Sequence, residues 1–334
     1  MFDNPFHQQE LRPHHFLITG GAGFVGANLV AYLVKYGAGK VRILDNLSTG
    51  FIHNIQPFLE TDRVEFIEGD IRDLPTCQAA CQDIHFVLHQ AALGSVPRSI
   101  DNPIATNEAN ITGFLNMLVA AKDNQVKRFV YAASSSTYGD SQRLPKVEEE
   151  IGKPLSPYAL TKYVNELYAD VFHRTYGLDC IGLRYFNIYG PKQSPAGAYA
   201  AVIPLFIKAI LEGEAPYING DGEQTRDFTF VENAVQANIK AALAPQKAAN
   251  QIYNVACGER ISINQLFQYL KNFAGTSLEA IHRTPRKGDV RNSLADITKA
   301  QKLLNYQPNI KIEQGLEMTF QWFKKTYEQI DQTN

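Results

Sequence analysis

The sequence has few cysteines, and their spacing suits neither a disulfide scaffold nor a zinc site. Only four occur among 334 residues, at Cys77, Cys81, Cys180 and Cys257. Cys77 and Cys81 are spaced to share a helix face, but no second Cys or His pair completes the four ligands of a structural zinc site. The sequence therefore predicts reduced thiols in a cytoplasmic protein and no metal site.

Long apolar runs and an excess of charge are also lacking. No stretch approaches the roughly 20 apolar residues that a membrane-spanning helix needs. Residues 1–13 are polar and include Asp3 and Glu10, unlike a secretory signal, so we expect an N-terminal arm and a cytoplasmic location. The net charge is only −2. Neither nucleic acid nor a membrane surface is therefore expected as a partner.

The first half of the chain alternates short β-type runs with helical segments. Buried strands are predicted at 16–18, 41–44, 64–67, 86–88, 129–131 and 180–183, and helices at 24–36, 104–121 and 158–176. This alternation is typical of the doubly wound α/β class, in which helices cover both faces of a parallel sheet. We expect such a Rossmann domain over residues 14–190. Residues 191–334 predict a smaller mixed α/β substrate lobe, interleaved with the first domain.

A glycine-rich segment between the first strand and the first helix predicts a dinucleotide site. Gly20 can form the tight turn, Gly23 lets the backbone approach a pyrophosphate, and Gly26 permits close packing of helix on strand. The predicted helix begins at Phe24, and the unpaired N–H groups of Phe24 and Val25 can bind phosphate.

The acidic residue that ends the second strand favours NAD over NADP. The carboxylate of Asp45 can accept hydrogen bonds from the ribose hydroxyls and would repel a 2′-phosphate. Asp70 suits a contact to the adenine edge, and Ala91 and Ala92 are small enough for the cofactor to lie against the backbone. The other positions expected at the cofactor are Asn46, Ser48, Thr49, Gly50, Ile71, Gln90 and Tyr185.

A tyrosine and a lysine four residues apart predict a general base. Tyr158 and Lys162 share a helix face, and Ser134 and Ser136 end the fifth strand, where sites of open α/β sheets form. Hydride removal from a carbinol needs a base for the hydroxyl proton, and a free tyrosine, with a pKa of about 10, is mostly protonated. We expect the lysine and a cationic nicotinamide ring to lower the pKa of Tyr158.

These motifs, with the segment 184–187, resemble the extended short-chain dehydrogenase/reductase family of sugar-nucleotide enzymes over residues 14–325. Within the family, segments such as 93–98, 198–204 and 288–293 are most similar to bacterial UDP-N-acetylglucosamine 4-epimerases, some of which act on the corresponding uronic acids. The resemblance implies that Tyr158 takes the proton from the sugar 4-hydroxyl while hydride passes to NAD. The 4-keto sugar then presents its other face, and the hydride returns. Ser134 would be the catalytic hydroxyl and Ser136 a second contact to the sugar.

The resemblance also implies contacts to a UDP-sugar substrate. Arg226 and Arg291 would grip the diphosphate with their guanidinium forks. Asn187 would bond to the diphosphate and Asn219 would lie near the uridine. Ser293 would border the C2 substituent of the sugar, where a small residue leaves room for an acetamido group. The remaining expected substrate contacts are Ser95, Ser134, Val202 and Tyr217.

A homodimer is implied as well, held by a four-helix bundle of residues 104–121 and 158–176 with their symmetry mates. The apolar residues that could form its surface, some of which must face the sheet instead, are Leu115, Leu118, Val119, Leu167, Val171 and Phe172.

Other reactions of the family are disfavoured by the serine run. The 4,6-dehydratases carry an Asp-Glu pair where Ser135 and Ser136 stand, and UDP-glucuronate decarboxylases carry a glutamate at the position of Ser136. The open alternatives for the substrate are a UDP-N-acetylhexosaminuronic acid and the pair UDP-Glc/UDP-Gal. A non-catalytic NAD-binding redox sensor is the alternative of another class, although such relatives usually lose the Tyr/Lys pair.

Overall fold

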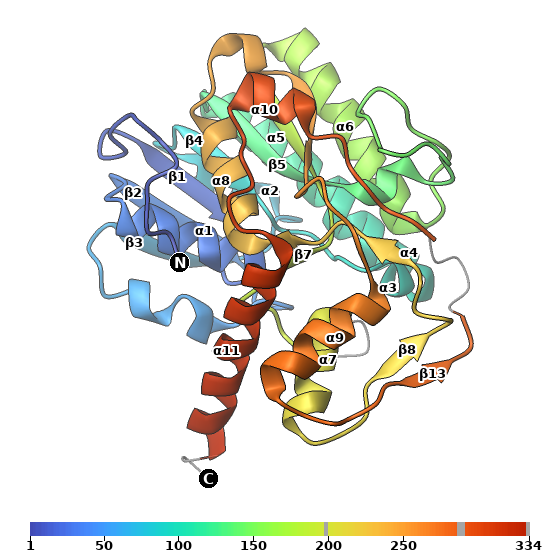
Figure 1. The fold of residues 1–334 in the computed structure, drawn as a ribbon. Helices are drawn as coiled ribbons and strands as arrows, with labels where there is room; N and C mark the ends of the chain where they lie inside the picture. Colours follow the sequence, from blue (N-terminus) through green and yellow to red (C-terminus); the bar gives the residue numbers. More distant parts are fainter. Residues whose placement is uncertain (197–199, 286–290, 332–334) are drawn as a thin grey trace.

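The computed structural model of the chain describes residues 1–196, 200–285 and 291–331. Its centre is a seven-stranded parallel sheet with helices on both faces (Figure 1). From edge to edge the strands are β11 (Gln251–Val255), β6 (Cys180–Tyr185), β5 (Arg128–Ser134), β4 (Phe86–His89), β1 (His15–Thr19), β2 (Lys40–Asp45) and β3 (Val64–Glu68). The doubly wound α/β fold predicted from the sequence is confirmed.

The two central strands, β1 and β4, are mainly apolar because both faces of the sheet are covered there. Every residue of β4 is buried, as is every residue of β1 after His15. A parallel sheet buried on two faces selects such runs instead of the alternation seen in half-exposed sheets. The order of the strands reverses between β1 and β4, which is where ligands of open α/β sheets bind.

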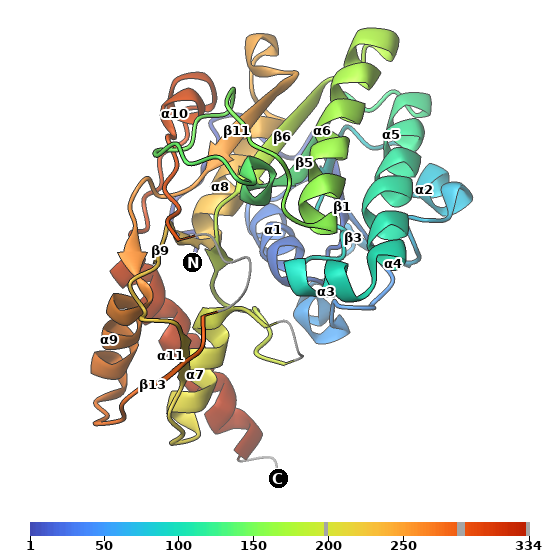
Figure 2. The same cartoon turned by 90° about the vertical axis from the view of Figure 1, so that its right-hand side faces the viewer.

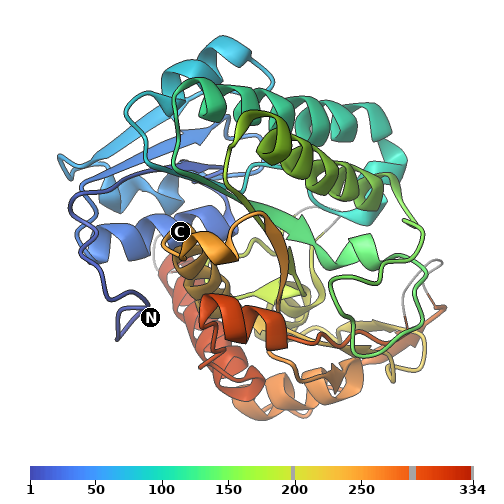
Figure 3. The ribbon, with the colours of Figure 1, turned by 90° about the horizontal axis from the view of Figure 1, so that it is seen from above.

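Two layers of helices enclose the sheet, and a view from above shows one layer on each side of it (Figure 3). One layer holds α2 (Leu74–Cys81), α5 (Gly113–Asp123) and α6 (Pro157–Tyr176), and the other holds α1 (Phe24–Lys35), α8 (Val231–Ala242) and α10 (Thr298–Leu304). Helix α6 is bounded as the sequence predicts. Ser156 caps its first turn by accepting from the N–H of Ala159, and Gly177 ends it in the left-handed conformation.

The segment predicted as one helix over 104–121 is more irregular. It comprises α4 (Pro103–Asn107), a π-helical turn η3 (Glu108–Thr112) and α5, and the short helix α3 (Val96–Asp101) precedes it. Asn102 separates α3 from α4 because its side chain caps Ala105 and Pro103 cannot continue the preceding helix.

A second lobe lies below the sheet in Figure 2, with its own apolar core. Its helices are α7 (Val202–Leu211), α9 (Ile263–Ala274) and α11 (Ile312–Asp331). Three small sheets join the lobe internally and to the sheet domain: β8 (Tyr217–Asn219) with β13 (Ile281–Arg283), β9 (Thr225–Arg226) with β12 (Ile261–Ser262), and β7 (Ile188–Tyr189) with β10 (Thr229–Phe230). Strand β11 and helix α8 follow residue 190 in sequence yet belong to the large sheet and its cover. The domain boundary at residue 190 stays a prediction.

The first residues of the chain pack on α1. Phe2 and Leu11 are buried, and the ring of Phe6 stacks on that of Tyr32 with centroids 4.9 Å apart. The four cysteines are free and buried. Within residues 1–196, 200–285 and 291–331, no helix is long and apolar enough to cross a membrane, and no cluster of three or more His, Cys, Asp or Glu is arranged to hold a metal.

Candidate active site

The glycine-rich loop runs from the end of β1 into α1, and there is no room for a side chain at Gly20 or at Gly26. Gly20 has a φ of +66°, and a Cβ there would lie 2.7 Å from the N of Ala91. A Cβ at Gly26 would lie 2.1 Å from the carbonyl oxygen of Gly20. At Gly23 a Cβ would meet only that same oxygen, at 3.1 Å. Phe24 and Val25 open α1 beside this uncrowded stretch, so the cradle suits a diphosphate.

The carboxylate of Asp45 holds the glycine-rich loop and the turn after β2. It accepts hydrogen bonds from the backbone N–H of Ala22 (2.9 Å) and of Leu47 (2.8 Å). Burial raises its pKa, and these backbone donors oppose that rise. Asp45 lies 8% exposed at the carboxyl end of β2, where its remaining lone pairs can accept from a ribose.

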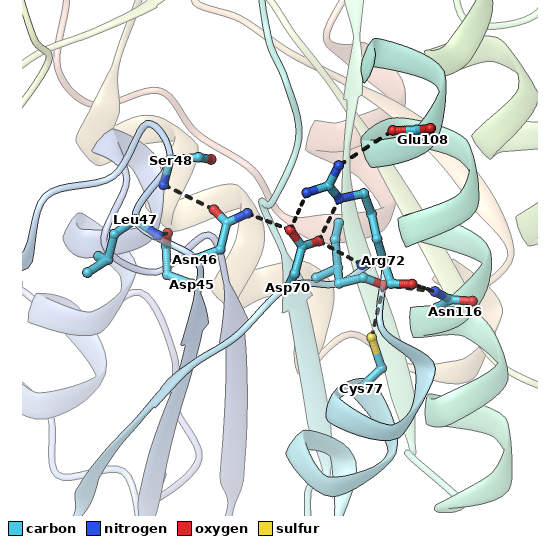
Figure 4. A network of polar contacts seen from close by, with 10 residues as sticks. Asp45, Asn46, Leu47, Ser48, Asp70, Arg72, Cys77, Glu108 and Asn116 are labelled. Carbon is cyan, nitrogen blue, oxygen red and sulfur yellow. Dashed lines mark hydrogen bonds and ion pairs between the residues drawn. The ribbon is translucent and has the colours of Figure 1, made fainter. Parts of the chain in front are cut away.

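A polar chain continues from Asp45 across the carboxyl edge of the sheet (Figure 4). Asn46 accepts from the N–H of Ser48 and donates to Asp70, whose other partner is the guanidinium of Arg72. The hydrogen bond from the Arg72 side chain is the largest cause that lowers the pKa of Asp70, to about 2. The next positions toward α1 are the exposed Thr49 and the buried Gly50, and Ile71 is buried beside Asp70.

Gln90 and Tyr185 are expected at the cofactor. Both are hydrogen-bonded to Asn238, a residue that was not predicted from the sequence. The hydroxyl of Tyr185 donates to Gln90 Oε1 (3.0 Å), Gln90 Nε2 donates to Asn238 Oδ1 (3.0 Å), and Asn238 Nδ2 donates to Tyr185 (2.7 Å). This closed triangle joins β4, β6 and α8. Ala91, which follows Gln90, donates its N–H to Thr19, and Ala92 comes next in the loop.

The four expected catalytic residues come together at the ends of β5 and α6. Ser136 donates its hydroxyl to Ser134 Oγ at 2.8 Å, and the hydroxyl of Tyr158 is hydrogen-bonded to Ser134. Lys162 is 3% exposed, donates to the carbonyl oxygen of Ala132 at 2.8 Å, and lies 5.9 Å from the centre of the Tyr158 ring. One serine hydroxyl therefore touches both the base and the second serine.

The expected lowering of the Tyr158 pKa by its lysine is wrong for the protein by itself. Burial of the hydroxyl raises the pKa of Tyr158, and the bond to Ser134 opposes only part of that rise. The side chain keeps some solvent exposure, but the hydroxyl lies deep among protein atoms. Burial also lowers the pKa of Lys162 to about 8, so desolvation weakens the very charge that was expected to favour the phenolate.

A pocket of about 170 Å³ opens in the second lobe, and Asn187, which follows β6, is its one wall next to the large sheet among the described residues. Five residues expected at the substrate line it, namely Asn187, Val202, Tyr217, Asn219 and Arg226. Its other walls were not predicted from the sequence; they are Phe206, Ile218, Gln224, Phe228 and Ile263. The apolar pattern of α7 indicates a buried face at Phe206, but no sequence signal shows that this face borders a pocket.

The other expected substrate residues lie outside the walls of this pocket. Arg291 is exposed and pairs with Asp221 at 2.9 Å. Ser293 is half-buried and donates its N–H to the carbonyl of Thr225, the residue before Arg226. Arg291 and Ser293 lie outside the strands of the structure, and the residue between them, Asn292, makes an isolated bridge with Thr225 of β9, so this segment borders the pocket through β9. Ser95 caps α3 by accepting from the N–H of Arg98 at 3.4 Å.

Comparison with known proteins gives a consistent result. Residues 16–256 match the family described as the NAD dependent epimerase/dehydratase family. Among solved structures, a UDP-N-acetylglucosamine 4-epimerase from Methanobrevibacter ruminantium M1, in complex with UDP-N-acetylmuramic acid, is 38% identical. Its TM-score is 0.89, and the match covers 94% of this chain and 99% of that one.

Curated relatives are similar over the same length. A putative UDP-glucose 4-epimerase of Methanocaldococcus jannaschii is 38% identical over 92% of this chain and 98% of its own. A UDP-glucuronate 4-epimerase of Thermodesulfobacterium geofontis is 36% identical over 95% and 98% respectively. These relatives share a reaction at C4 and differ in the sugar.

Proposed function

This chain belongs to the NAD dependent epimerase/dehydratase family, and from that membership we propose that it interconverts the C4 epimers UDP-GlcNAc and UDP-GalNAc. The observation that carries the proposal is that the expected groups gather at one edge of the parallel sheet. The glycine-rich cradle follows the carboxyl end of β1, the Ser134–Tyr158–Lys162 set lies at that of β5, and Asn187, which lines the pocket with Arg226, follows that of β6. Plain epimerisation needs no further acid next to Ser134.

The roles of the residues follow from their contacts. Tyr158 takes the proton of the 4-hydroxyl and the hydroxyl of Ser134 holds the reacting oxygen. Lys162 is kept near the ring of Tyr158 by its hydrogen bond to the carbonyl of Ala132. Bound NAD supplies the acceptor and donor of the hydride at C4. Gly20, Gly23, Gly26 and Asp45 would hold it. Arg226 would anchor the diphosphate while the sugar turns.

The preference for an N-acetylated sugar rests on Ser293. Its side chain is small, and its N–H donates to the carbonyl of Thr225, the neighbour of Arg226 in the pocket wall, which supports a site with space at C2. The corresponding uronic acid and the pair UDP-Glc/UDP-Gal are the competing substrates. A homodimer and a cytoplasmic location also belong to the proposal.

The test is incubation of the purified protein, without added NAD, with UDP-GlcNAc, UDP-Glc and UDP-GlcNAcA, followed by separation of the C4 epimers. We expect the highest kcat/KM on UDP-GlcNAc. Turnover of UDP-GlcNAcA or UDP-Glc in preference contradicts the proposed sugar but leaves the reaction intact. No epimer from any UDP-sugar, with NAD bound to the protein, contradicts the proposed activity and favours the redox-sensor alternative.

A further inference from the structure

A lysine occupies a turn position that favours glycine. In the turn Gly190–Gln193 the N–H of Gln193 donates to the carbonyl of Gly190, Pro191 is second, and Lys192 is third with a φ of +72°. A turn with proline as its second residue and a positive φ at its third residue is a type II turn, and its third residue is normally glycine or asparagine. The left-handed conformation is strained for a lysine, and such strain concentrates at functional positions. The side chain of Lys192 is therefore a candidate for a role that glycine could not fill.

Lys192 is half-buried, and its ammonium has no acidic partner among the described residues. It donates to the carbonyl oxygen of Asn54 at 2.6 Å and lies 5.2 Å from the centre of the Phe58 ring. Among the ion pairs of the described residues, none includes this lysine. Burial lowers its pKa to about 8. Because an ammonium has three donors and a buried charge is costly unless paired, this geometry calls for an anion.

The contacts of Lys192 lead to the cofactor cradle by two routes. Asn54, which accepts from the lysine, is 6% exposed and donates its side chain to the carbonyl of Ala22 in the glycine-rich loop at 2.9 Å. From the other side, Asn28 on α1 donates to the carbonyl of Pro191 at 3.2 Å. The lysine is thus tied to the loop through Asn54, and the turn that carries it is tied through Pro191 to the helix whose N-terminus suits a diphosphate.

We propose that Lys192 is a cofactor-retaining residue. Its ammonium complements the diphosphate of bound NAD, and its bond to Asn54 fixes the glycine-rich loop through Ala22. The substrate also carries a diphosphate, but the contacts of Lys192 run to the cofactor loop, whereas Arg226 and Asn187 line the substrate pocket. The proposal rests on NAD binding and not on the identity of the sugar.

The experiment compares Lys192→Met and Lys192→Gly with the wild type. The holoenzyme is gel-filtered, and the release of NAD is followed by exchange with labelled NAD. We expect both variants to release NAD at least about tenfold faster, as for the loss of one charge-assisted hydrogen bond. Lys192→Gly should also keep or raise the melting temperature of the NAD-free protein, because glycine relieves the strained φ. A residue that serves only to support the fold does not give these two opposite effects.

Lys240→Met is the matched control. Lys240 also donates to a backbone carbonyl, that of Asn305, and burial also lowers its pKa, but it lies at the end of α8. It should retain NAD like the wild type. Equal NAD release in the wild type and both Lys192 variants overturns the proposal, as does equally faster release in Lys240→Met. A raised KM for the UDP-sugar with unchanged NAD release would assign the ammonium to the diphosphate of the substrate instead, and also overturns it.

Discussion

At the scale of single residues, the packing around the hydroxyl of Tyr158 determines its pKa. Burial raises its pKa, the contact with Ser134 opposes the rise, and Lys162 is itself desolvated. The phenolate therefore needs a further positive charge, which the oxidised cofactor brings when it is bound. Activity should consequently rise with pH along its acid limb, as the fraction of deprotonated base increases.

Tyr158→Phe tests the base directly. Removing the hydroxyl should lower kcat by about 10²-fold or more and leave the bound NAD unchanged, because the reaction then lacks its general base while the cofactor cradle is untouched. Initial rates and the NAD content per subunit check this. Tyr163→Phe, the same change on the same helix, should turn over normally. Near-normal turnover of Tyr158→Phe would remove the residue from its assigned role.

Ser293→Tyr tests the choice of sugar. A tyrosine would fill the space proposed for the acetamido group, so turnover of UDP-GlcNAc should fall severely while UDP-Glc/UDP-Gal is spared. The measurement is kcat/KM for both pairs in both proteins. Equal losses on the two pairs would mean that Ser293 only supports the segment that borders β9.

At the scale of elements, the β1–loop–α1 unit allows little change. A Cβ atom at Gly26 would lie 2.1 Å from the carbonyl oxygen of Gly20, so α1 packs against the end of β1 too closely for a side chain at this position. The same closeness leaves the N–H groups at the start of α1 open to a ligand.

Gly26→Ala should therefore abolish NAD binding or the fold. A Cβ at 2.1 Å from a backbone oxygen forces strand and helix apart. Gly177→Ala is the control: it sits in a left-handed C-cap with open space around it, so it should cost about 1 kcal/mol of stability and leave NAD bound. The melting temperature and the absorbance of bound NAD are measured for both variants and distinguish Gly26→Ala from Gly177→Ala. Full NAD content in Gly26→Ala would show that the loop can relax.

Elements whose position depends on residues close by in the sequence were predictable. Elements whose position depends on pairing with residues far away in the sequence were not. Strand β4 is an apolar run because both its faces are covered, and α6 is bounded by Ser156 and Gly177. Strand β11 contains Gln251 and Asn254, and its place follows from pairing with β6, far away in sequence. In the site, the i, i+4 spacing indicated Tyr158 and Lys162. The sign of the Tyr158 pKa, the bond between Lys192 and Asn54, and the role of Gln224 in a pocket wall depend on packing that spacing does not encode.

At the scale of the whole molecule, one side of the sheet domain exposes apolar side chains. Ile104 is 72% exposed, Ile100 60%, Leu160 51%, Leu167 49% and Val171 42%. Of the six residues considered for a dimer surface, Leu118 and Phe172 face the sheet, whereas Leu167 and Val171 face outward. The helices that carry these side chains, α3, α4 and α6, contact one another on the face that is turned to the viewer in Figure 2. Such a patch indicates a partner surface.

We predict that a second copy of the chain covers this patch. Light scattering should give about twice the monomer mass of 37.3 kDa at micromolar concentration. The double substitution Leu167→Glu and Val171→Glu places charges in the proposed interface and should give monomers. Leu205→Glu, at an exposed leucine of α7, should leave the dimer intact. A monomeric wild type refutes the dimer.

The late arrival of β11 has a consequence for how the protein is made. A ribosome delivers β6 about seventy residues before the strand that pairs with it, so the nascent chain carries an uncovered sheet edge and the bare face that α8 will later occupy. An unpaired edge of this kind is a template for association with other chains. A gene shortened after residue 190 should therefore yield insoluble material and not a free nucleotide-binding fragment, and chaperones have their best opportunity to bind while residues 191–255 are still being synthesised.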